Sequence, residues 1–249
     1  MATELASQDI AQLLSKSLLF GALDGGARRE LAGHARRESF DIGEPIFHVG
    51  APGQSMMVIL NGTVRVSLPG PRGKGVILDD LPAGELLGEV ALLDGKERSA
   101  DATALTRCEF VVLERRDVVA FLEKRPDICL KLLELMCARL RKSDQRMSDI
   151  AFLELSVRLA KVLLDRISPT GRAGAKSKLS LSQTELANMI NATRENVNRC
   201  LRNWQRRGIL DLDERRIVIL QREVLGAIAG IPDITRSAAG SLPDIITAG

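Results

Sequence analysis

The residues best suited to bind a ligand lie close together between positions 88 and 100. Gly88 has no side chain and lets the backbone approach a ligand closely. The short apolar segment Glu89–Leu93 can form one helical turn whose free N–H groups face an anion. Arg98 can donate two parallel hydrogen bonds to phosphate oxygens, and the Ser99 hydroxyl adds a donor. This spacing predicts a small phosphate-binding loop.

Glu89 needs its own explanation, because a carboxylate does not belong beside a bound phosphate. An ionised carboxylate only accepts hydrogen bonds, so Glu89 suits a ribose hydroxyl attached to that phosphate. The alternative is a glycine-rich turn between strands with a solvated arginine. The pair Gly88-Glu89 followed closely by Arg98-Ser99-Ala100 makes the ligand site the more specific interpretation.

This combination resembles the phosphate-binding cassette of cyclic-nucleotide-binding domains. Nearly the whole chain resembles the cyclic AMP receptor protein (CRP/FNR) group of bacterial transcription regulators. The resemblance implies that Arg98, Ser99 and nearby N–H groups hold a cyclic phosphate, and that Glu89 holds the ribose. The expected nucleotide-binding residues of the cassette, defined here as residues 88–100, are Gly88, Glu89, Val90, Ala91, Arg98, Ser99 and Ala100.

The bulk composition limits the class of protein. The chain has 249 residues, enough for one large or two modest domains, and its 45% hydrophobic residues allow a sizeable core. A net charge of only +3 excludes a uniformly basic surface. The segment Thr170–Arg222, however, has eleven Lys and Arg against five Asp and Glu, a net charge of +6. This local excess indicates an anionic partner such as DNA.

The cysteines and the N-terminus give further limits. No Cys-x-x-Cys pair occurs, so neither zinc nor an iron–sulfur cluster is expected, and no metal site is predicted. The cysteines are dispersed, which predicts reduced, buried thiols; they are Cys108, Cys129, Cys137 and Cys200. We find no signal peptide and no apolar run that could span a membrane, and expect a cytoplasmic protein with no membrane partner.

Short apolar segments with turn residues between them fill positions 38 to 113 after a helical pattern in residues 1–32. The pair Asn61-Gly62 between two apolar runs predicts a β-hairpin. About eight strands at this spacing predict a small β-sandwich or jelly-roll barrel. We therefore expect a sensor domain over residues 1–124.

A long helix is predicted from Arg125 to Ile150, in a dimerisation and hinge segment over residues 125–152. Apolar residues recur there at alternating spacings of four and three, which is a heptad seam. The expected seam residues are Leu133, Met136, Leu140, Met147 and Ile150, with Cys129 and Ser143 in the same register. So narrow a seam predicts a parallel homodimer, the alternative being that the stripe packs on the chain's own barrel.

Three polar residues of this helix bear on the ligand. In the resembled family this part of the helix faces the purine, so the resemblance places Ser143 at the base and Arg139 near the ribose and Glu89. Asp144 departs from the family, which has a small hydroxyl residue there. Its carboxylate can accept from the amino group of adenine or from N1–H and the amino group of guanine, or it can simply be solvated. Ser99 and Ser143 favour cyclic AMP over cyclic GMP.

Residues 179–207 have the layout of a helix-turn-helix. Ser182 with Glu185 forms a capping-box pattern, and Thr193 can cap a second helix. Two apolar runs around residues 213–215 then predict a hairpin, giving a winged helix-turn-helix over residues 153–230. Residues 231–249 have no clear period and are predicted to be a loosely held tail.

The second helix carries the chemistry for reading base edges. Arginine bonds N7 and O6 of guanine, and glutamate accepts from N4 of cytosine. By resemblance, Arg194, Glu195 and Arg199 read a GTG-containing half-site in a TGTGA…TCACA type of palindrome. Asn198 replaces a small residue of the family, so preference at a neighbouring base can differ. A solvated charged helix face is the alternative. The expected DNA-binding residues are Ser182, Thr184, Thr193, Arg194, Glu195, Asn196, Asn198, Arg199 and Arg202.

These expectations combine into an α+β homodimeric transcription regulator, not an enzyme, which binds cyclic AMP or cyclic GMP and thereby double-stranded DNA. RNA polymerase is a further expected partner. The competing hypotheses are a regulator of the same fold that is ligand-independent or senses another effector, a regulatory module of an enzyme, and an enzyme acting on cyclic nucleotides. The intact cassette argues against the first, the charged second helix against the second, and the lack of a catalytic motif against the third.

Overall fold

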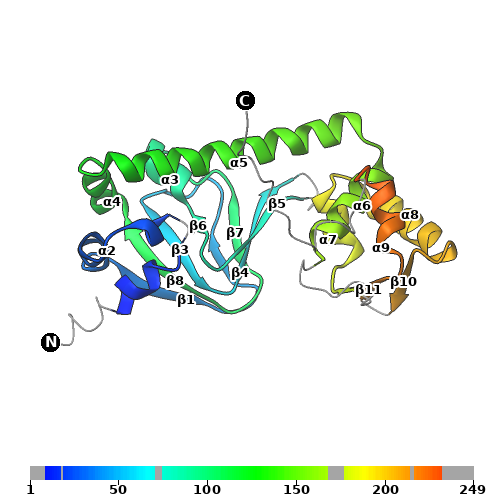
Figure 1. Cartoon of the computed structure of the whole chain (residues 1–249), viewed down its shortest axis with the longest axis horizontal. Coiled ribbons are helices and arrows are strands. Elements are labelled where there is room, and N and C mark those ends of the chain that lie inside the picture. The colour runs from blue at the N-terminus through cyan, green and yellow to red at the C-terminus, as the bar shows by residue number, and fades with distance from the viewer. Residues whose placement is uncertain (1–8, 18, 71–74, 168–176, 214–215, 232–249) are drawn as a thin grey trace, which may run out of the picture. The chain divides into compact units, whose positions relative to one another are not determined.

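A computed structural model describes residues 9–17, 19–70, 75–167, 177–213 and 216–231 (Figure 1). The chain divides into two compact units, Met1–Ser143 and Asp144–Gly249. The division falls within the long helix α5 (Pro126–Phe152), whereas the sequence suggested a sensor domain that ends at residue 124. The domain limits drawn from the sequence stay predictions.

The first unit opens with short helical pieces. Residues 9–14 are helical, and η1 (Phe20–Ala22) and α2 (Gly25–Ala32) follow. The Asp24 side chain accepts a hydrogen bond of 2.9 Å from Ala27 N and so caps α2. Buried side chains such as Leu14 and Phe20 pack these pieces against the barrel.

Two four-stranded sheets form the barrel. One has the order β1-β8-β3-β6 and the other β2-β7-β4-β5. The strands are β1 (Arg36–Phe40), β2 (Pro45–Phe47), β3 (Ser55–Asn61), β4 (Thr63–Pro69), β5 (Gly75–Pro82), β6 (Leu86–Leu87), β7 (Asp101–Ala104) and β8 (Cys108–Glu114). Side chains from both sheets, among them Val64, Ala102 and Phe110, fill one core. The predicted barrel is therefore confirmed, and β1 and β6 are strands that the sequence pattern did not reveal.

The hairpin predicted at Asn61-Gly62 is wrong. Strand β3 pairs with β6 and β8, whereas β4 pairs with β5 and β7, so the turn carries the chain from one sheet to the other. Gly62 has φ +91°, and a Cβ there would lie 2.5 Å from Arg107 O and 2.7 Å from Cys108 Sγ. The glycine is needed because the corner packs tightly, not because a hairpin turns there.

Three helices accompany the barrel: α3 (Glu89–Asp94), α4 (Arg115–Leu122) and α5. Figure 1 shows α3 beside β6 and α5. The observed α5 agrees with the predicted helix and continues two residues beyond Ile150. Within the described residues, no helix combines the length and the apolar character needed to cross a membrane.

The second unit contains α6 (Leu155–Asp165), α7 (Gln183–Met189), α8 (Arg194–Arg206) and α9 (Arg222–Ile228). Its sheet has the order β10-β11-β9, from β9 (Ser177–Leu179), β10 (Leu210–Asp213) and β11 (Arg216–Ile219). Within this sheet, Lys178 of β9 pairs with Val218 of β11. The wing turn at residues 214–215 and the tail from residue 232 lie outside the described residues.

Candidate functional site

The entry to α3 is built around a glycine. Gly88 has φ +81° and precedes the first residue of α3. A Cβ at this position would lie 2.3 Å from Nη1 of Arg98 and 3.2 Å from Ser55 O. Glycine is strongly favoured here, because a side chain would strain the backbone and displace the nearby guanidinium.

Glu89 is a buried carboxylate with incomplete bonding. Its exposed fraction is 1%, and its Oε1 accepts a hydrogen bond from Nη1 of Arg139. Its Oε2 is buried and has no hydrogen-bond partner in the described chain. Buried polar atoms nearly always have a partner, so this oxygen is suited to accept a hydrogen bond from a bound ligand.

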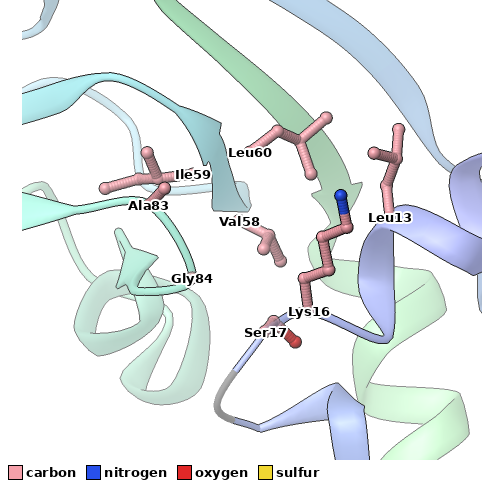
Figure 2. A pocket seen from close by; sticks show the side chains of 8 residues that line it. All are labelled: Leu13, Lys16, Ser17, Val58, Ile59, Leu60, Ala83 and Gly84. Atoms are coloured by element: carbon pink, nitrogen blue, oxygen red, sulfur yellow. The ribbon is translucent and has the colours of Figure 1, made fainter.

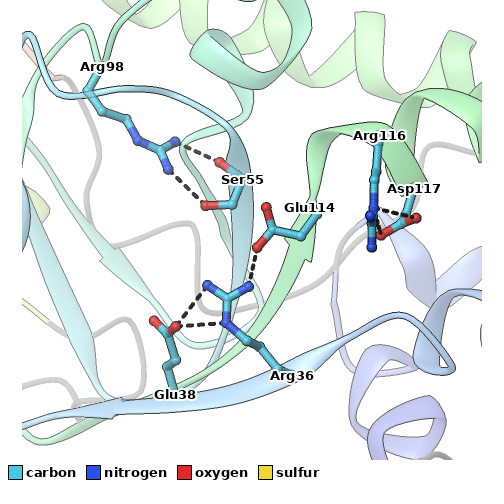
Figure 3. Close-up of polar contacts among 7 residues, drawn as sticks. All are labelled: Arg36, Glu38, Ser55, Arg98, Glu114, Arg116 and Asp117. Carbon is cyan, nitrogen blue, oxygen red and sulfur yellow. Dashed lines mark hydrogen bonds and ion pairs between the residues drawn. The ribbon is translucent and has the colours of Figure 1, made fainter.

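Arg98 is a buried cation held from one side (Figure 3). Its exposed fraction is 6%, and Nη1 donates to Ser55 O at 2.7 Å and to Gly88 O at 3.1 Å. Nη2 donates to Ser55 Oγ at 3.0 Å, and the guanidinium carbon lies 4.4 Å from the centre of the Phe47 ring. Nε is buried and lacks a partner among the described residues.

Burial makes the charge of Arg98 costly. Desolvation lowers the pKa of its guanidinium, and the more distant charges of Glu89 and Glu114 only oppose that effect. In the described part of the chain, no carboxylate lies within ion-pair distance of Arg98. Burying a charge is costly unless an opposite charge or hydrogen bonds compensate it. An anionic ligand at Nε would supply both.

The other cassette residues fall into two groups. Ala91, in α3, and Ala100, just before β7, have buried side chains, so they can contact a ligand only through their backbone. Val90 is partly exposed, and Ser99 is exposed with no side-chain hydrogen bond to the described chain. The Ser99 hydroxyl is thus available to a ligand, and its binding role stays a prediction.

Arg139 joins helix α5 to the cassette. Besides its ion pair with Glu89, its Nη2 donates to Leu86 O at 2.6 Å and lies 3.7 Å from Glu85 Oε2. Lys142, one turn later, bonds Asp79 of β5 at 2.7 Å. The sequence anticipated the proximity of Arg139 to Glu89 but not Glu85, Leu86 or Asp79. Contacts between residues so far apart leave no signal in local spacing.

No polar contact joins the side chain of Ser143 or Asp144 to another described residue. Both are exposed on α5, and neither side chain makes a hydrogen bond within the described chain. Their expected roles at the base stay predictions.

The seam of α5 is largely exposed. Leu140 is 62% exposed and Met147 is 68% exposed, and Leu133 and Ile150 are exposed as well, while Met136 is half-buried. The helix instead uses Ile128 and Leu132 to pack on its own barrel. The alternative that the whole stripe packs on the barrel is therefore wrong.

The cysteines only partly match expectation. Cys108 is buried, Cys129 and Cys200 are half-buried, and Cys137 is exposed. The prediction of buried thiols fails at Cys137 because its side of α5 does not face the barrel. Burial raises the pKa of the Cys200 thiol to about 11.

The helix-turn-helix is built as its capping residues predict. Ser182 Oγ accepts from Glu185 N at 3.1 Å, and the Glu185 side chain accepts from Ser182 N at 2.9 Å, which completes the capping box. Asn191 forms the turn with φ +50°. Thr193 then accepts from Asn196 N at 3.3 Å and caps α8.

Helix α8 separates apolar and charged faces. Val197, Leu201 and Trp204 are buried in the core of the second unit. The opposite face exposes Arg194, Glu195, Asn196, Arg199 and Arg202, and Thr184 is exposed on α7. An exposed, arginine-rich second helix of this kind is the element that enters a major groove.

Asn198 has a structural contact that the sequence did not reveal. It is half-buried, and its Oδ1 accepts from Gln183 Nε2 at 3.3 Å and from Arg202 Nε at 3.2 Å. Asn198 therefore links α7 to α8 and orients Arg202. Any effect on base preference would act partly through this link.

A small cleft elsewhere is a poor candidate for the ligand site (Figure 2). It has a volume of about 110 Å³, and its walls come from the N-terminal segment, β3 and the turn before β6. The lining residues are Leu13, Lys16, Ser17, Val58, Ile59, Leu60, Ala83 and Gly84. None belongs to the cassette, and the Ser17 hydroxyl is already bonded to Leu14 O and Phe20 N. Among the described residues, no three potential metal ligands are grouped.

Comparison with known proteins matches both units. A family model described as a cyclic nucleotide-binding domain matches residues 37–125, and one described as a Crp-like helix-turn-helix domain matches residues 157–228. The chain is 31% identical over 194 residues to the cyclic AMP receptor protein of Thermus thermophilus, covering 78% of this chain and 88% of that protein.

Two further proteins are similar over most of their length. The chain is 27% identical over 217 residues to the CRP-like cAMP-activated global transcriptional regulator of Mycobacterium tuberculosis, covering 86% of this chain and 97% of that protein. The solved structure of the c-di-GMP responsive global regulator CLP of Xanthomonas campestris shares the fold, with a TM-score of 0.71 at 21% identity, covering 79% of this chain and 99% of that one. With its cyclic-nucleotide-binding barrel and its DNA-binding helix-turn-helix, the chain belongs to the CRP/FNR family of transcription regulators.

Proposed function

We propose that this regulator binds a cyclic nucleotide at residues 88–100, cyclic AMP in preference to cyclic GMP, and as a homodimer then binds a TGTGA-type palindrome. The observation that carries the proposal is that residues 88–100 hold two buried side-chain atoms without a hydrogen-bond partner in the described chain, Glu89 Oε2 and Arg98 Nε. One needs a donor and the other an acceptor. A ribose hydroxyl and a cyclic phosphate supply these two groups in a single ligand.

Each part of the ligand has a proposed partner. The phosphate bonds Arg98 Nε and the Ser99 hydroxyl, and a ribose hydroxyl donates to Glu89 Oε2. The base lies near Ser143 and Asp144 on α5. The preference for cyclic AMP rests on Ser99 and Ser143 and on the two relatives that are named for this ligand.

The ligand would act through Arg139. This residue shares Glu89 with the ribose, so the bound nucleotide changes what holds α5 to the cassette. A ligand shifts an equilibrium only through its different affinities for two arrangements. We propose that these are two alignments of the paired α5 seams, which present the recognition helices differently to DNA and RNA polymerase.

Titration calorimetry of the purified protein with cyclic AMP, cyclic GMP and cyclic di-GMP, each separately, tests the ligand. We expect cyclic AMP to bind most tightly and Arg98→Ala to lose binding at least a hundredfold, because both charge and bidentate bonding are lost. Arg116→Ala is the matched control, since Arg116 is an exposed arginine paired only with its neighbour Asp117 in the described chain (Figure 3).

The outcomes separate the hypotheses. Tightest binding of cyclic GMP or cyclic di-GMP would overturn the ligand preference but keep the sensor. Absence of binding by all three would overturn the sensor and leave a DNA-binding regulator that is ligand-independent or responds to another effector.

DNA binding is tested by fluorescence anisotropy on a TGTGA…TCACA duplex with and without the bound nucleotide. We expect ligand to tighten binding, and Arg199→Ala to weaken it by about 1–3 kcal/mol with relaxed preference at one base pair. If Arg199→Ala binds the palindrome and a duplex with that one base pair exchanged in each half-site equally well, while the parent prefers the palindrome, this arginine reads that base pair. An unchanged affinity and preference would contradict the assignment.

A further inference from the structure

We propose that Ser55 is the positioning residue for Arg98, holding its guanidinium so that only the Nε side is offered to the phosphate. This inference rests on the proposed nucleotide site and names the residue that presets it. Ser55 lies in β3, outside the cassette, and no part of the cassette spacing points to it.

The hydrogen bonds of Arg98 are divided unequally around its guanidinium. A guanidinium has five N–H donors. Both donors of Nη1 are used, on Ser55 O and Gly88 O, and one donor of Nη2 is used on Ser55 Oγ. Nε and the second donor of Nη2 are left. A guanidinium presents Nε and one Nη side by side as a fork that fits two phosphate oxygens.

Ser55 contributes two of the three acceptors. Its carbonyl and its hydroxyl contact different nitrogens of the same guanidinium, at 2.7 Å and 3.0 Å (Figure 3). The backbone of Ser55 is fixed by pairing with Glu114 of β8, and the residue is buried. The hydroxyl therefore acts from a rigid strand, which makes its position a property of the barrel and not of the loop.

Phe47 completes the arrangement from another strand. Its ring lies 4.4 Å from the guanidinium carbon and so limits rotation of the guanidinium. Gly88 leaves the space that Nη1 occupies. With one side anchored and the surroundings desolvated, Arg98 needs little reorganisation to bind an anion.

The test compares Ser55→Ala with Ser55→Thr. Ser55→Ala removes the hydroxyl but keeps the backbone carbonyl, and we expect nucleotide affinity in titration calorimetry to fall about tenfold. Ser55→Thr restores a hydroxyl on a residue type that strands favour, and we expect affinity to recover to within about threefold of the parent. Ser67→Ala, a serine of β4 with no side-chain hydrogen bond in the described chain, is the control and should leave affinity unchanged.

A second measurement does not need a ligand. In the ligand-free protein, the anchored guanidinium should give a protected Arg98 Nε–H signal and separate Nη signals by ¹⁵N NMR. Ser55→Ala should merge the Nη signals through faster rotation, whereas Ser67→Ala should not. A purely structural role of Ser55 would lower the unfolding midpoint without changing these signals.

The outcomes distinguish this inference from the proposed function. If the parent binds a cyclic nucleotide and Ser55→Ala binds it equally well, the positioning role is wrong and the nucleotide site stands. If the parent binds no cyclic nucleotide but the Arg98 signals depend on Ser55, the proposed ligand is wrong and the anchoring stands. Signals that do not depend on Ser55 overturn the inference.

Discussion

Arg98 and Glu89 are buried charges whose own contacts satisfy them only in part. Breaking a buried pair by removing one partner is usually strongly destabilising, whereas a ligand that completes the bonding stabilises both partners. Arg139 compensates Glu89 from α5, but Arg98 is compensated by neutral oxygens alone in the described chain. A bound anion would therefore stabilise the buried charge of Arg98.

Gly88 gives a direct test of this packing. Gly88→Ala should destabilise the protein by about 1–2 kcal/mol more than Gly43→Ala, since the added Cβ displaces the Arg98 guanidinium. Gly43 is the matched control, because its φ of +82° equals that of Gly88 within a degree while nothing lies within 4 Å of a Cβ there. Urea unfolding measures the free energy of unfolding of both variants. Equal losses of stability would mean that the Arg98 guanidinium moves aside without cost.

Cys200 predicts a pH dependence of the second unit. Because burial raises the pKa of its thiol to about 11, the folded state keeps the proton longer than the unfolded state does. The resulting stabilisation is complete below about pH 8.5 and is lost as pH rises through about 11. Urea unfolding at pH 8 and pH 10.5 should show this loss in the parent and a smaller one in Cys200→Ala. An identical loss of stability in the parent and in Cys200→Ala would mean that other titrating groups cause the pH dependence.

At the scale of elements, α5 has two parts: one packs on the barrel, and the other carries an exposed apolar seam. Its first turns bury Ile128 and Leu132 against the barrel, while most seam residues beyond them remain exposed, namely Leu133, Leu140, Met147 and Ile150. An exposed apolar stripe of this length indicates an interface. The heptad spacing favours a second copy of the same helix as the partner.

The seam makes a prediction about assembly. Leu140→Lys should convert the proposed dimer to a monomer, because it would place two desolvated charges opposite each other at the interface. Ser148→Lys adds the same charge at an exposed position of α5 outside the seam and should leave the dimer intact. Sedimentation equilibrium measures both variants. A Leu140→Lys dimer with parent affinity would show that α5 is not the interface.

At the scale of the whole molecule, sensing and DNA binding are joined by one continuous helix. Arg139, in the cassette contacts, and Asp149, which bonds Lys161 of α6 at 2.9 Å, lie on the same α5. In the proposed mechanism, a change in how the cassette holds α5 reaches the end of the helix that precedes α6. Coupling of this kind is reciprocal, so DNA should also raise affinity for the nucleotide.

In the proposed dimer each copy contributes one α8 helix, so tight DNA binding should require both halves of the palindrome. A dimer contacts two half-sites about 10 base pairs apart, and each half-site contributes binding energy. We expect the parent to prefer the full palindrome over a single half-site by at least a hundredfold, and Leu140→Lys to lose that preference. Anisotropy with both duplexes measures it. If a proven monomer still prefers the full palindrome over a single half-site, the proposed binding by a dimer is contradicted.

Local patterns in the amino-acid sequence were enough to predict many structural features of this protein. The capping box at Ser182, the Thr193 cap and the heptad of α5 depend on residues within a turn or two of each other, so sequence spacing is enough to predict them. The match of Gly88-Glu89 and Arg98-Ser99 to a phosphate-binding loop is also local. For the same reason the barrel, the long helix and the winged helix-turn-helix could be predicted, and the family models match both units.

Only the tertiary structure decided the remaining features. Whether Asn61-Gly62 makes a hairpin depends on which strands pair, and those partners lie far along the chain. The anchoring of Arg98 by Ser55 and Phe47 and the ties of Arg139 to Glu85 and Leu86 join residues that are separated by tens of positions. Local propensity carries no information on such contacts, because they are set by how sheets and helices pack around a shared core.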